Sequence, residues 1–138
     1  LEIIRATGKT FSSFRTQKKA NRPFEIIKVG LNLPREELYQ RINLRVDLMM
    51  EEGLLEEATS LFDLRELNAL QTVGYRELFA HFDGEYDLNF AVEEIKKNTR
   101  RFAKRQLTWF NKDVNIQWFS PLESEEIKKY LQKKILNS

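Results

Sequence analysis

The sequence predicts a mostly helical domain that contains two short parallel strands. Apolar residues recur at helical spacing over most of the chain, whereas two short runs are rich in β-branched and aromatic residues. A long helical stretch separates these runs, and this favours parallel pairing because parallel strands require a long crossover connection. The chain has 138 residues, 41% of them hydrophobic, so it can bury a core and is too apolar for a disordered segment.

The chain begins within a helical pattern. Residues 1–6 predict the end of a helix that stops near Gly8, and residues 12–22 form a polar, basic connector. The next run, Phe24–Val29, is apolar at nearly every position, which predicts a strand buried on both faces. Because the chain starts in mid-pattern and without a methionine, we expect it to be a fragment of a longer protein.

The remaining elements follow from turn and capping signals. Pro34 opens a helix, Gly53 ends it, and Asp87 caps a second long helix that carries many basic residues. Ser120 and Glu123 have the spacing of a capping box and predict a last helix. The predicted helices cover residues 34–52, 54–62, 74–82 and 87 onward, and the second strand covers residues 115–119.

Composition excludes several kinds of site. The chain has no cysteine, which excludes disulfides and thiolate-bound metals and favours a reducing compartment. The one histidine, His81, fits a helix end or the surface, so metal binding or histidine-based catalysis would depend on carboxylates or on this residue. No long apolar run predicts a membrane span or a secretory signal. We therefore expect a cytoplasmic protein with no metal site of its own and no membrane partner.

The stretch Lys96–Lys112 is the most informative part of the chain for function. It holds seven basic residues and no acidic one. One side of the predicted helix is expected to pack and carries Ile95, Thr99, Phe102, Gln106, Trp109 and Phe110. The opposite side is expected to meet anions and carries Lys96, Lys97, Arg100, Arg101, Lys104 and Arg105. The alternative is an ordinary solvated helix, but such helices usually mix Glu with Lys.

Charge is segregated along the chain although the formal net charge is only +2. Residues 1–28 hold seven basic and two acidic residues, whereas residues 36–66 hold three basic and nine acidic ones. Folding can therefore gather positive charge on one side of the molecule, which matters more for steering a polyanion than net charge does.

Two other patterns carry less meaning. The segment Thr7–Thr10, T-G-K-T, matches the end of a phosphate-binding loop, but the first glycine of that motif would fall at Ile3, with no preceding strand. We therefore expect Lys9 to be a surface or helix-end cation. The glutamates of residues 51–57 follow helical spacing and lack the oxygen spacing of a calcium loop, so we interpret them as a solvated face.

Four motifs occur together in this chain. They are T-G-K-T at Thr7–Thr10, Q-R-I-N-L-R at Gln40–Arg45, T-V-G-Y-R-E at Thr72–Glu77 and A-K-R-Q-L-T-W-F at Ala103–Phe110. In this order and at this spacing, they resemble the C-terminal half of the tRNA dimethylallyltransferases. The resemblance extends from Leu1 to about Phe119, and V-G-Y-R-E followed by A-K-R-Q-x-T-W is its most specific part.

The resemblance implies an enzyme that moves a dimethylallyl group from its diphosphate to the exocyclic amine of the adenosine immediately 3′ of a tRNA anticodon. It implies an α/β fold of the P-loop-kinase-like kind, with a helical insertion domain that closes on the tRNA. Residues 1–22 would be the end of that insertion and a connector, and residues 23–138 the C-terminal part of the catalytic core with tRNA-binding helices. The implied partners are the tRNA anticodon stem-loop and dimethylallyl diphosphate, and the implied cofactor is Mg²⁺, with ligands outside this chain.

The resemblance also implies roles for individual residues. Arg45 matches the arginine that holds the diphosphate, where a guanidinium can grip two oxygens and stabilise charge on the leaving group. Without the resemblance, a buried ion pair with a carboxylate would be the better interpretation of Arg45. Gln71 stands where the family carries a basic residue, which weakens a phosphate contact, and Phe102 stands where a tyrosine or aliphatic is frequent, which suggests a core position. The residues expected to contact tRNA are Gln71, Thr72, Val73, Gly74, Tyr75, Arg76, Arg100, Lys104, Arg105, Gln106, Thr108 and Trp109.

The family's phosphate loop and the carboxylate that acts as general base have no counterpart in this sequence, so we expect the chain alone to be inactive. A free-standing RNA-binding or adaptor module would show the same charge pattern and is the main alternative. A protein-interaction bundle is a third class, and it predicts partners whose binding is insensitive to salt. An uncovered strand edge also offers a route to a dimer of the fragment.

Overall fold

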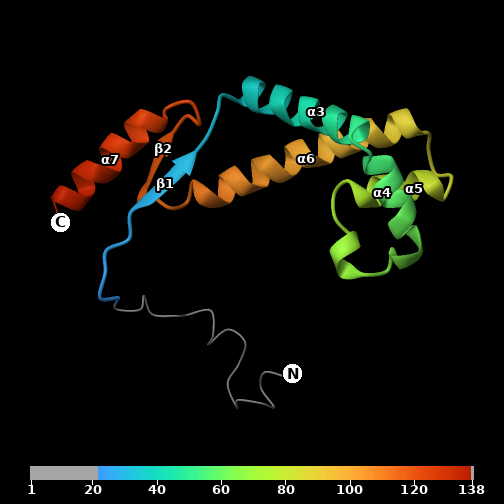
Figure 1. Cartoon of the computed structure of the whole chain (residues 1–138), viewed down its shortest axis with the longest axis horizontal. Helices are drawn as coiled ribbons and strands as arrows, with labels where there is room; N and C mark the ends of the chain where they lie inside the picture. The colour runs from blue at the N-terminus through green and yellow to red at the C-terminus, as the bar shows by residue number, and fades with distance from the viewer. Residues whose placement is uncertain (1–21, 138) are drawn as a thin grey trace, which may run out of the picture.

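The computed structural model describes residues 22–137 and is mostly helical, with two parallel strands, as the sequence predicts (Figure 1). The predicted helix end at residues 1–6, the T-G-K-T segment and nearly all of the connector lie outside the described residues. The elements are, in order, β1 (Lys28–Leu31), α3 (Arg35–Glu51), α4 (Leu54–Leu61), the 3-10 turns η1 (Phe62–Leu64) and η2 (Asn68–Leu70), α5 (Tyr75–Phe82), α6 (Leu88–Phe110), β2 (Ile116–Phe119) and α7 (Ser124–Leu136).

The two strands pair in parallel, in a register that places Lys28 opposite Ile116 and Gly30 opposite Trp118. The connection between them runs through four helices, so the predicted crossover is confirmed. A Cβ at position 30 would lie 2.6 Å from Cε3 of Trp118 and 2.8 Å from Cγ2 of Ile116. The Trp118 ring therefore occupies the space that any larger residue at position 30 would need.

The first strand begins later than the sequence predicts. The run Phe24–Val29 was expected to be a strand buried on both faces, but β1 starts at Lys28, and Phe24 and Ile26 are 61% and 51% exposed. The partner strand β2 is only four residues long, so no described strand lies beside residues 24–27. The prediction is therefore wrong for the start of this strand and for its burial.

Helices α3 and α6 lie side by side, run in opposite directions and form the long axis of the molecule (Figure 1). The sheet and α7 lie at one end of this pair, and α4 and α5 lie at the other (Figure 1). Asp87 caps α6 as predicted, since its Oδ1 accepts a 2.8 Å hydrogen bond from the backbone N of Phe90. No helix within residues 22–137 is both long enough and apolar enough to cross a bilayer.

The core lies where α3, α4, α5 and α6 meet. Its buried members are Val46, Ala58, Leu78, Phe79, Ala91 and Ile95. The ring of Phe62 packs against Phe79 and Phe82 with centroid distances of 5.7 Å and 5.4 Å, which joins η1 to α5. This core fixes the start of α5 and the first half of α6, and both of these elements carry candidate functional residues.

Two helix boundaries show how local signals act. Gly53 follows α3 with a φ of 106°, in the left-handed region that favours glycine, so the predicted helix end is confirmed. The last helix, α7, begins later than the capping-box spacing predicts. The carboxylate of Glu123 accepts a 3.2 Å hydrogen bond from N of Ser120, but the Ser120 hydroxyl accepts from Leu122, so these contacts close a turn that precedes the helix.

Candidate nucleic-acid interface

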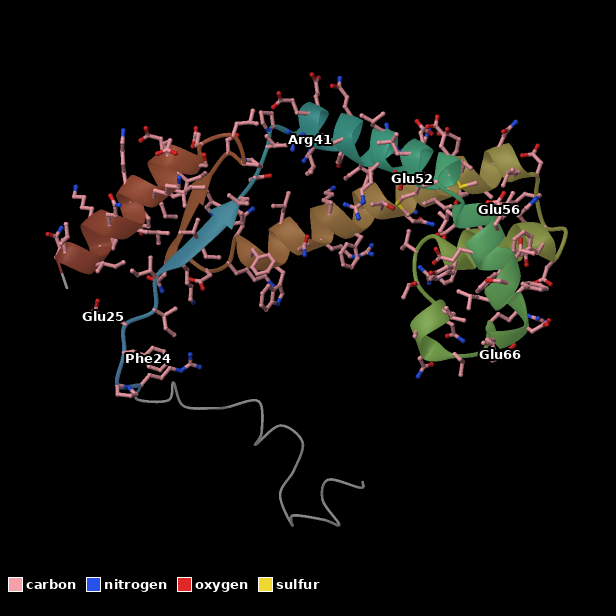
Figure 2. All side chains as sticks on the ribbon, in the orientation of Figure 1. Phe24, Glu25, Arg41, Glu52, Glu56 and Glu66 are labelled. Atoms are coloured by element: carbon pink, nitrogen blue, oxygen red, sulfur yellow. The ribbon has the colours of Figure 1, made fainter. Side chains whose placement is uncertain are left out.

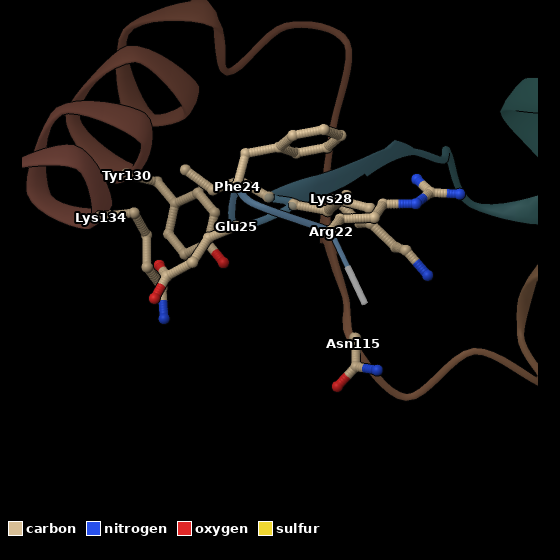
Figure 3. A pocket seen from close by; sticks show the side chains of 9 residues that line it. Arg22, Phe24, Glu25, Lys28, Asn115, Tyr130 and Lys134 are labelled. Carbon is tan, nitrogen blue, oxygen red and sulfur yellow. The ribbon is translucent and has the colours of Figure 1, made fainter. Parts of the chain in front are cut away.

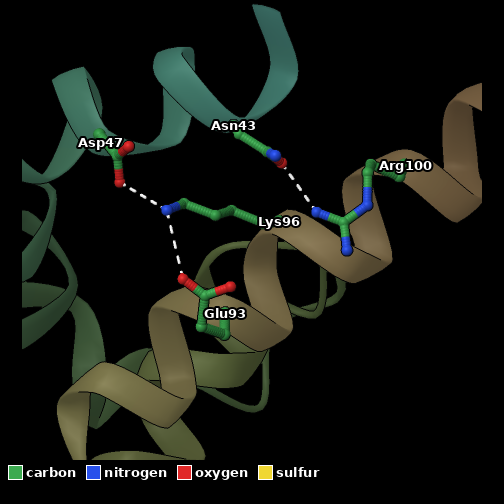
Figure 4. Close-up of polar contacts among 5 residues, drawn as sticks. All are labelled: Asn43, Asp47, Glu93, Lys96 and Arg100. Carbon is green, nitrogen blue, oxygen red and sulfur yellow. Dashed lines mark hydrogen bonds and ion pairs between the residues drawn. The ribbon is translucent and has the colours of Figure 1, made fainter. Parts of the chain in front are cut away.

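The structure divides the basic residues of α6 into two sets. Lys96 and Arg100 face α3 (Figure 4). The Nζ of Lys96 lies 2.8 Å from Oδ1 of Asp47, and Nη1 of Arg100 donates a 2.7 Å hydrogen bond to Oδ1 of Asn43. These two cations hold α3 against α6, and Lys97 is paired with Glu94 on the same helix, so the expected free cationic side is wrong at all three positions.

The second set lies near the C-terminal end of α6 and is exposed. Its four cations and two neighbours line a depression of about 480 Å³, and we call these six residues the α6 cationic surface: Arg101, Lys104, Arg105, Thr108, Trp109 and Lys112. Among residues 22–137, none of the four charged groups has a hydrogen bond or an ion pair. Unpaired cations at this density are suited to binding phosphates.

The side of α6 that was expected to pack is buried only in its first half. Ile95 is 1% exposed and belongs to the core. Phe102 and Trp109 are 54% and 67% exposed, so the expected core position of Phe102 is wrong. The buried core involves only the first half of α6, and no described element covers these two rings.

Residues 71–74 form the turn that leads into α5, and Tyr75 and Arg76 are the first two residues of that helix. Gly74 has a φ of 105°, and no heavy atom lies within 4 Å of the position that its Cβ would take, so conformation rather than space favours glycine there. Tyr75 donates a hydrogen bond from its hydroxyl to the carboxylate of Glu57. That bond, followed by burial and the negative charge of Glu57, raises the pKa of Tyr75 above its usual 10.0, so the hydroxyl stays neutral at physiological pH. Gln71, Thr72 and Arg76 are exposed, and Val73 is half-buried.

Sequence reasoning missed the part that Glu77 plays at this turn. This residue is 4% exposed, and its carboxylate accepts a 2.7 Å hydrogen bond from N of Gly74 and a 2.8 Å hydrogen bond from Nδ2 of Asn98 on α6. The glutamate stands three residues after Gly74, which is capping-box spacing, so the sequence did contain a signal for the first contact. The contact with Asn98 is tertiary and had no local signal.

Arg45 is exposed on α3 and has no hydrogen bond or ion pair with any described residue. The buried ion pair that was the alternative interpretation is therefore not formed within residues 22–137. Asn43 and Asp47 face α6, and Arg45 is two residues from each, or about 200° around the helix, so it lies on the face away from α6. The structure does not bring Arg45 next to the α6 cationic surface.

The predicted tRNA contacts are spread along α6 instead of converging on one pocket. Asn98 marks the position where the turn before α5 reaches α6. Lys104 lies about 9 Å from Asn98 along the helix axis. The last residues of α6 lie about 18 Å from Asn98 along the same axis. This arrangement suits an extended polyanion better than a small molecule.

Negative charge gathers at the other end of the molecule, and Figure 2 shows Glu52, Glu56 and Glu66 there, on and beside α4. No group of three acidic or histidine side chains within residues 22–137 is placed to hold a metal ion. His81 lies at the end of α5, as predicted, with Nδ1 2.8 Å from the carbonyl O of Tyr86.

A separate hollow of about 670 Å³ lies between the segment before β1 and α7 (Figure 3). Arg22, Lys28 and Lys134 bring positive charge to its wall, but Lys28 is paired with Asp113. It contains none of the residues predicted to bind tRNA or diphosphate, so we do not include it in the candidate interface.

Comparisons with known proteins agree with the motifs. A family model described as IPP transferase matches residues 1–113. The chain is 58% identical over 135 residues to tRNA dimethylallyltransferase 1 of Bacteroides fragilis, which covers 98% of this chain and 45% of that protein. It is 60% identical over 136 residues to the tRNA dimethylallyltransferase of Christiangramia forsetii, and that match covers 98% of this chain and 45% of that protein. The chain thus spans less than half the length of these curated relatives.

Solved structures give the same result. The full-length tRNA isopentenylpyrophosphate transferase of Bacillus halodurans matches with a TM-score of 0.74 and 38% identity, over 85% of this chain and 40% of that one. The tRNA delta(2)-isopentenylpyrophosphate transferase of Staphylococcus epidermidis matches with a TM-score of 0.74 and 32% identity, over 96% of this chain and 46% of that one. These neighbours have a P-loop-kinase-like fold, which confirms the predicted fold class. The family model, the relatives and the structures agree, and the chain belongs to the IPP transferase family.

Proposed function

We propose that this chain forms the C-terminal part of a tRNA dimethylallyltransferase. In that reaction, the exocyclic amine of the adenosine 3′ of the anticodon forms a bond to C1 of the dimethylallyl group. The bond between C1 and the diphosphate oxygen breaks, the diphosphate leaves with the bonding electrons, and the amine loses a proton to a base. Residues 1–22 are then the end of the helical insertion and a connector, and residues 23–138 the C-terminal part of the catalytic core.

The observation that carries this proposal is the α6 cationic surface. Its four cations have no partner within residues 22–137, and most of it falls on the A-K-R-Q-L-T-W-F motif. Each cation that meets a phosphate releases about one counterion, which favours binding of tRNA over binding of an uncharged partner. Residues 71–76 provide a second contact further along α6, where Gly74, Tyr75 and Arg76 approach the region of the target base.

Arg45 supplies the diphosphate contact in this proposal. Its guanidinium is exposed and free of partners among the described residues, so it can donate hydrogen bonds to two phosphate oxygens at once. Such a donor stabilises the negative charge that grows on the departing diphosphate. The phosphate loop and the general base come from outside residues 1–138, so the chain alone binds RNA weakly and transfers no prenyl group.

The apolar surface beside the sheet supports the assignment to a larger fold. A hollow of about 1130 Å³ is bordered by β1, β2 and the end of α6, and its walls include Ile27, Val29 and Phe110. Val114 at its edge is 91% exposed. A parallel sheet is normally covered on both faces, so this surface suits packing against the rest of a doubly covered sheet.

Prenyl transfer by the full-length protein that contains this chain tests the proposal. The protein is incubated with dimethylallyl diphosphate and tRNA, and the modified adenosine is measured by mass spectrometry. A matched tRNA with guanosine in place of the adenosine 3′ of the anticodon is the control. We expect modification of the first tRNA alone. Salt-sensitive tRNA binding without any modification would contradict the proposal and favour a free-standing RNA-binding or adaptor module.

A further inference from the structure

Glu77 is the one buried charged side chain among the residues that the structure describes. Its two carboxylate oxygens accept hydrogen bonds from different elements. Oε2 accepts from the backbone N of Gly74, in the turn before α5, and Oε1 accepts from Nδ2 of Asn98, in the middle of α6. One side chain therefore bridges the turn before α5 and the helix that carries the α6 cationic surface.

Stability alone does not explain a carboxylate at this position. Burying a charge is costly unless it is paired, and no cation within residues 22–137 forms an ion pair with Glu77. Its two donors, a backbone amide and a side-chain amide, are neutral. What the carboxylate provides is geometry, because two acceptors on one planar group fix both donors at 2.7–2.8 Å.

The bridge sets the position of the turn relative to α6. Gly74 in that turn has a φ of 105°, and its amide is held by Glu77. Asn98 lies on the same rigid helix as Lys104, about 9 Å away along the axis. Any change in the bridge therefore changes the spacing between residues 72–76 and the α6 cationic surface.

We propose that Glu77 is a positioning residue for tRNA, which sets this spacing through Gly74 and Asn98. This inference rests on the proposed function, since it requires that both segments contact tRNA. Loss of the bridge leaves α5 in place, because Tyr75 is still bonded to Glu57 and Phe79 is still packed against Phe62. The turn then loosens while the core remains folded.

A double-mutant cycle of the wild type, Asn98→Asp, Glu77→Gln and the double variant tests the bridge in the full-length protein. Asn98→Asp places a second carboxylate against the one at position 77, which breaks the contact. Adding Glu77→Gln restores it, because the new amide at position 77 accepts from Gly74 and donates to the new carboxylate at position 98. Glu85→Gln, an exposed glutamate just after α5, is the matched control for loss of one charge.

The measurement is the Kd for a fluorescent anticodon stem-loop RNA, with the KM for dimethylallyl diphosphate and the melting temperature recorded alongside. We expect Asn98→Asp to weaken RNA binding by about tenfold, as for one buried polar group left in an unfavourable contact, with an unchanged KM for the prenyl donor. The double variant should recover to within about threefold of the wild type. Glu85→Gln should bind normally.

Three results are distinguishable. A lower melting temperature for Asn98→Asp with a normal RNA Kd would mean that Glu77 is structural only and would overturn the inference. Additive effects, with no recovery in the double variant, would also overturn it. If the wild-type protein does not bind the stem-loop at all, the proposed function itself fails, and the inference fails with it. Glu77→Ala and Asn98→Ala, which break the bridge without adding charge, check that Asn98→Asp acts through this contact.

Discussion

Lys96 and Asp47 join the middle of α6 to α3 through an ion pair with an Nζ to Oδ1 distance of 2.8 Å. The pair forms between residues far apart in sequence, and it removes Lys96 from the cations that can bind RNA. Together with the bond from Arg100 to Asn43, it separates a structural set of basic residues from the α6 cationic surface (Figure 4). The two sets should respond differently to mutation.

Charge reversal at Lys104 and Arg105 should abolish most RNA binding by the chain. Both are exposed and unpaired within residues 22–137, so each should contact about one phosphate. The slope of log K against log salt should fall in magnitude by about two. Lys128→Glu with Lys129→Glu, on α7, is the matched control and should change the slope little. Wild-type binding that is the same at low and moderate salt would contradict the phosphate-contact mechanism.

Lys96→Met should lower the free energy of unfolding with little effect on RNA binding. The Asp47 side chain is half exposed, so the ion pair is worth only about 0.2–1 kcal/mol. Urea unfolding followed by circular dichroism measures this change, and the same salt titration checks RNA binding. A large loss of RNA affinity at normal stability would show that Lys96 contacts RNA directly.

The ion pair of Lys96 also predicts how the free energy of unfolding changes in the alkaline pH range. The hydrogen bond with Asp47, supported by Glu93, raises the pKa of Lys96 above its usual 10.5 although burial opposes this. Because the folded-state pKa is the higher one, the stabilisation is fully present below about pH 10.5 and is lost as pH rises through the raised pKa. Comparing urea unfolding of the wild type and of Lys96→Met across this range isolates the effect. An identical pH dependence in both proteins would exclude a raised pKa for Lys96.

Gly30→Ala should destabilise the sheet by about 1–3 kcal/mol, because the new methyl group overlaps the Trp118 ring. The ring must move, so the fluorescence of Trp118 should change. A Trp109→Phe background removes the other tryptophan and makes the signal specific. Normal stability with an unchanged emission spectrum would mean that the sheet accommodates a side chain at position 30.

The sequence was sufficient to predict features that depend on residues close together in the chain or on the length of a connection. The cap at Asp87, the helix end at Gly53 and the parallel pairing of two strands joined by helices are all confirmed. Each depends on a local preference or on chain length. The spacing of Glu77 from Gly74 was also present in the sequence, although its meaning was missed.

The errors concern features that depend on which surfaces meet. The helical wheel of α6 was correct at Ile95 but could not show that α3 bonds to Lys96 and Arg100. It also could not show that the core ends before Phe102, which is 54% exposed. The predicted start of β1 was wrong because a strand extends only where a partner strand lies beside it, and the sequence does not show where the partner ends.

The central claim is that this chain supplies part of a prenyl-transfer site. Mutation of Arg45 tests that claim most directly. The measurement is the single-turnover rate of prenyl transfer by the full-length enzyme with saturating tRNA. Arg45→Ala should slow transfer by about one to three orders of magnitude with little change in tRNA affinity, because one donor to the leaving diphosphate is lost. Arg45→Lys should recover part of the rate, since a point charge lacks the two-pronged grip of a guanidinium. Lys128→Ala on α7 serves as the control, and a normal rate in Arg45→Ala would contradict the account.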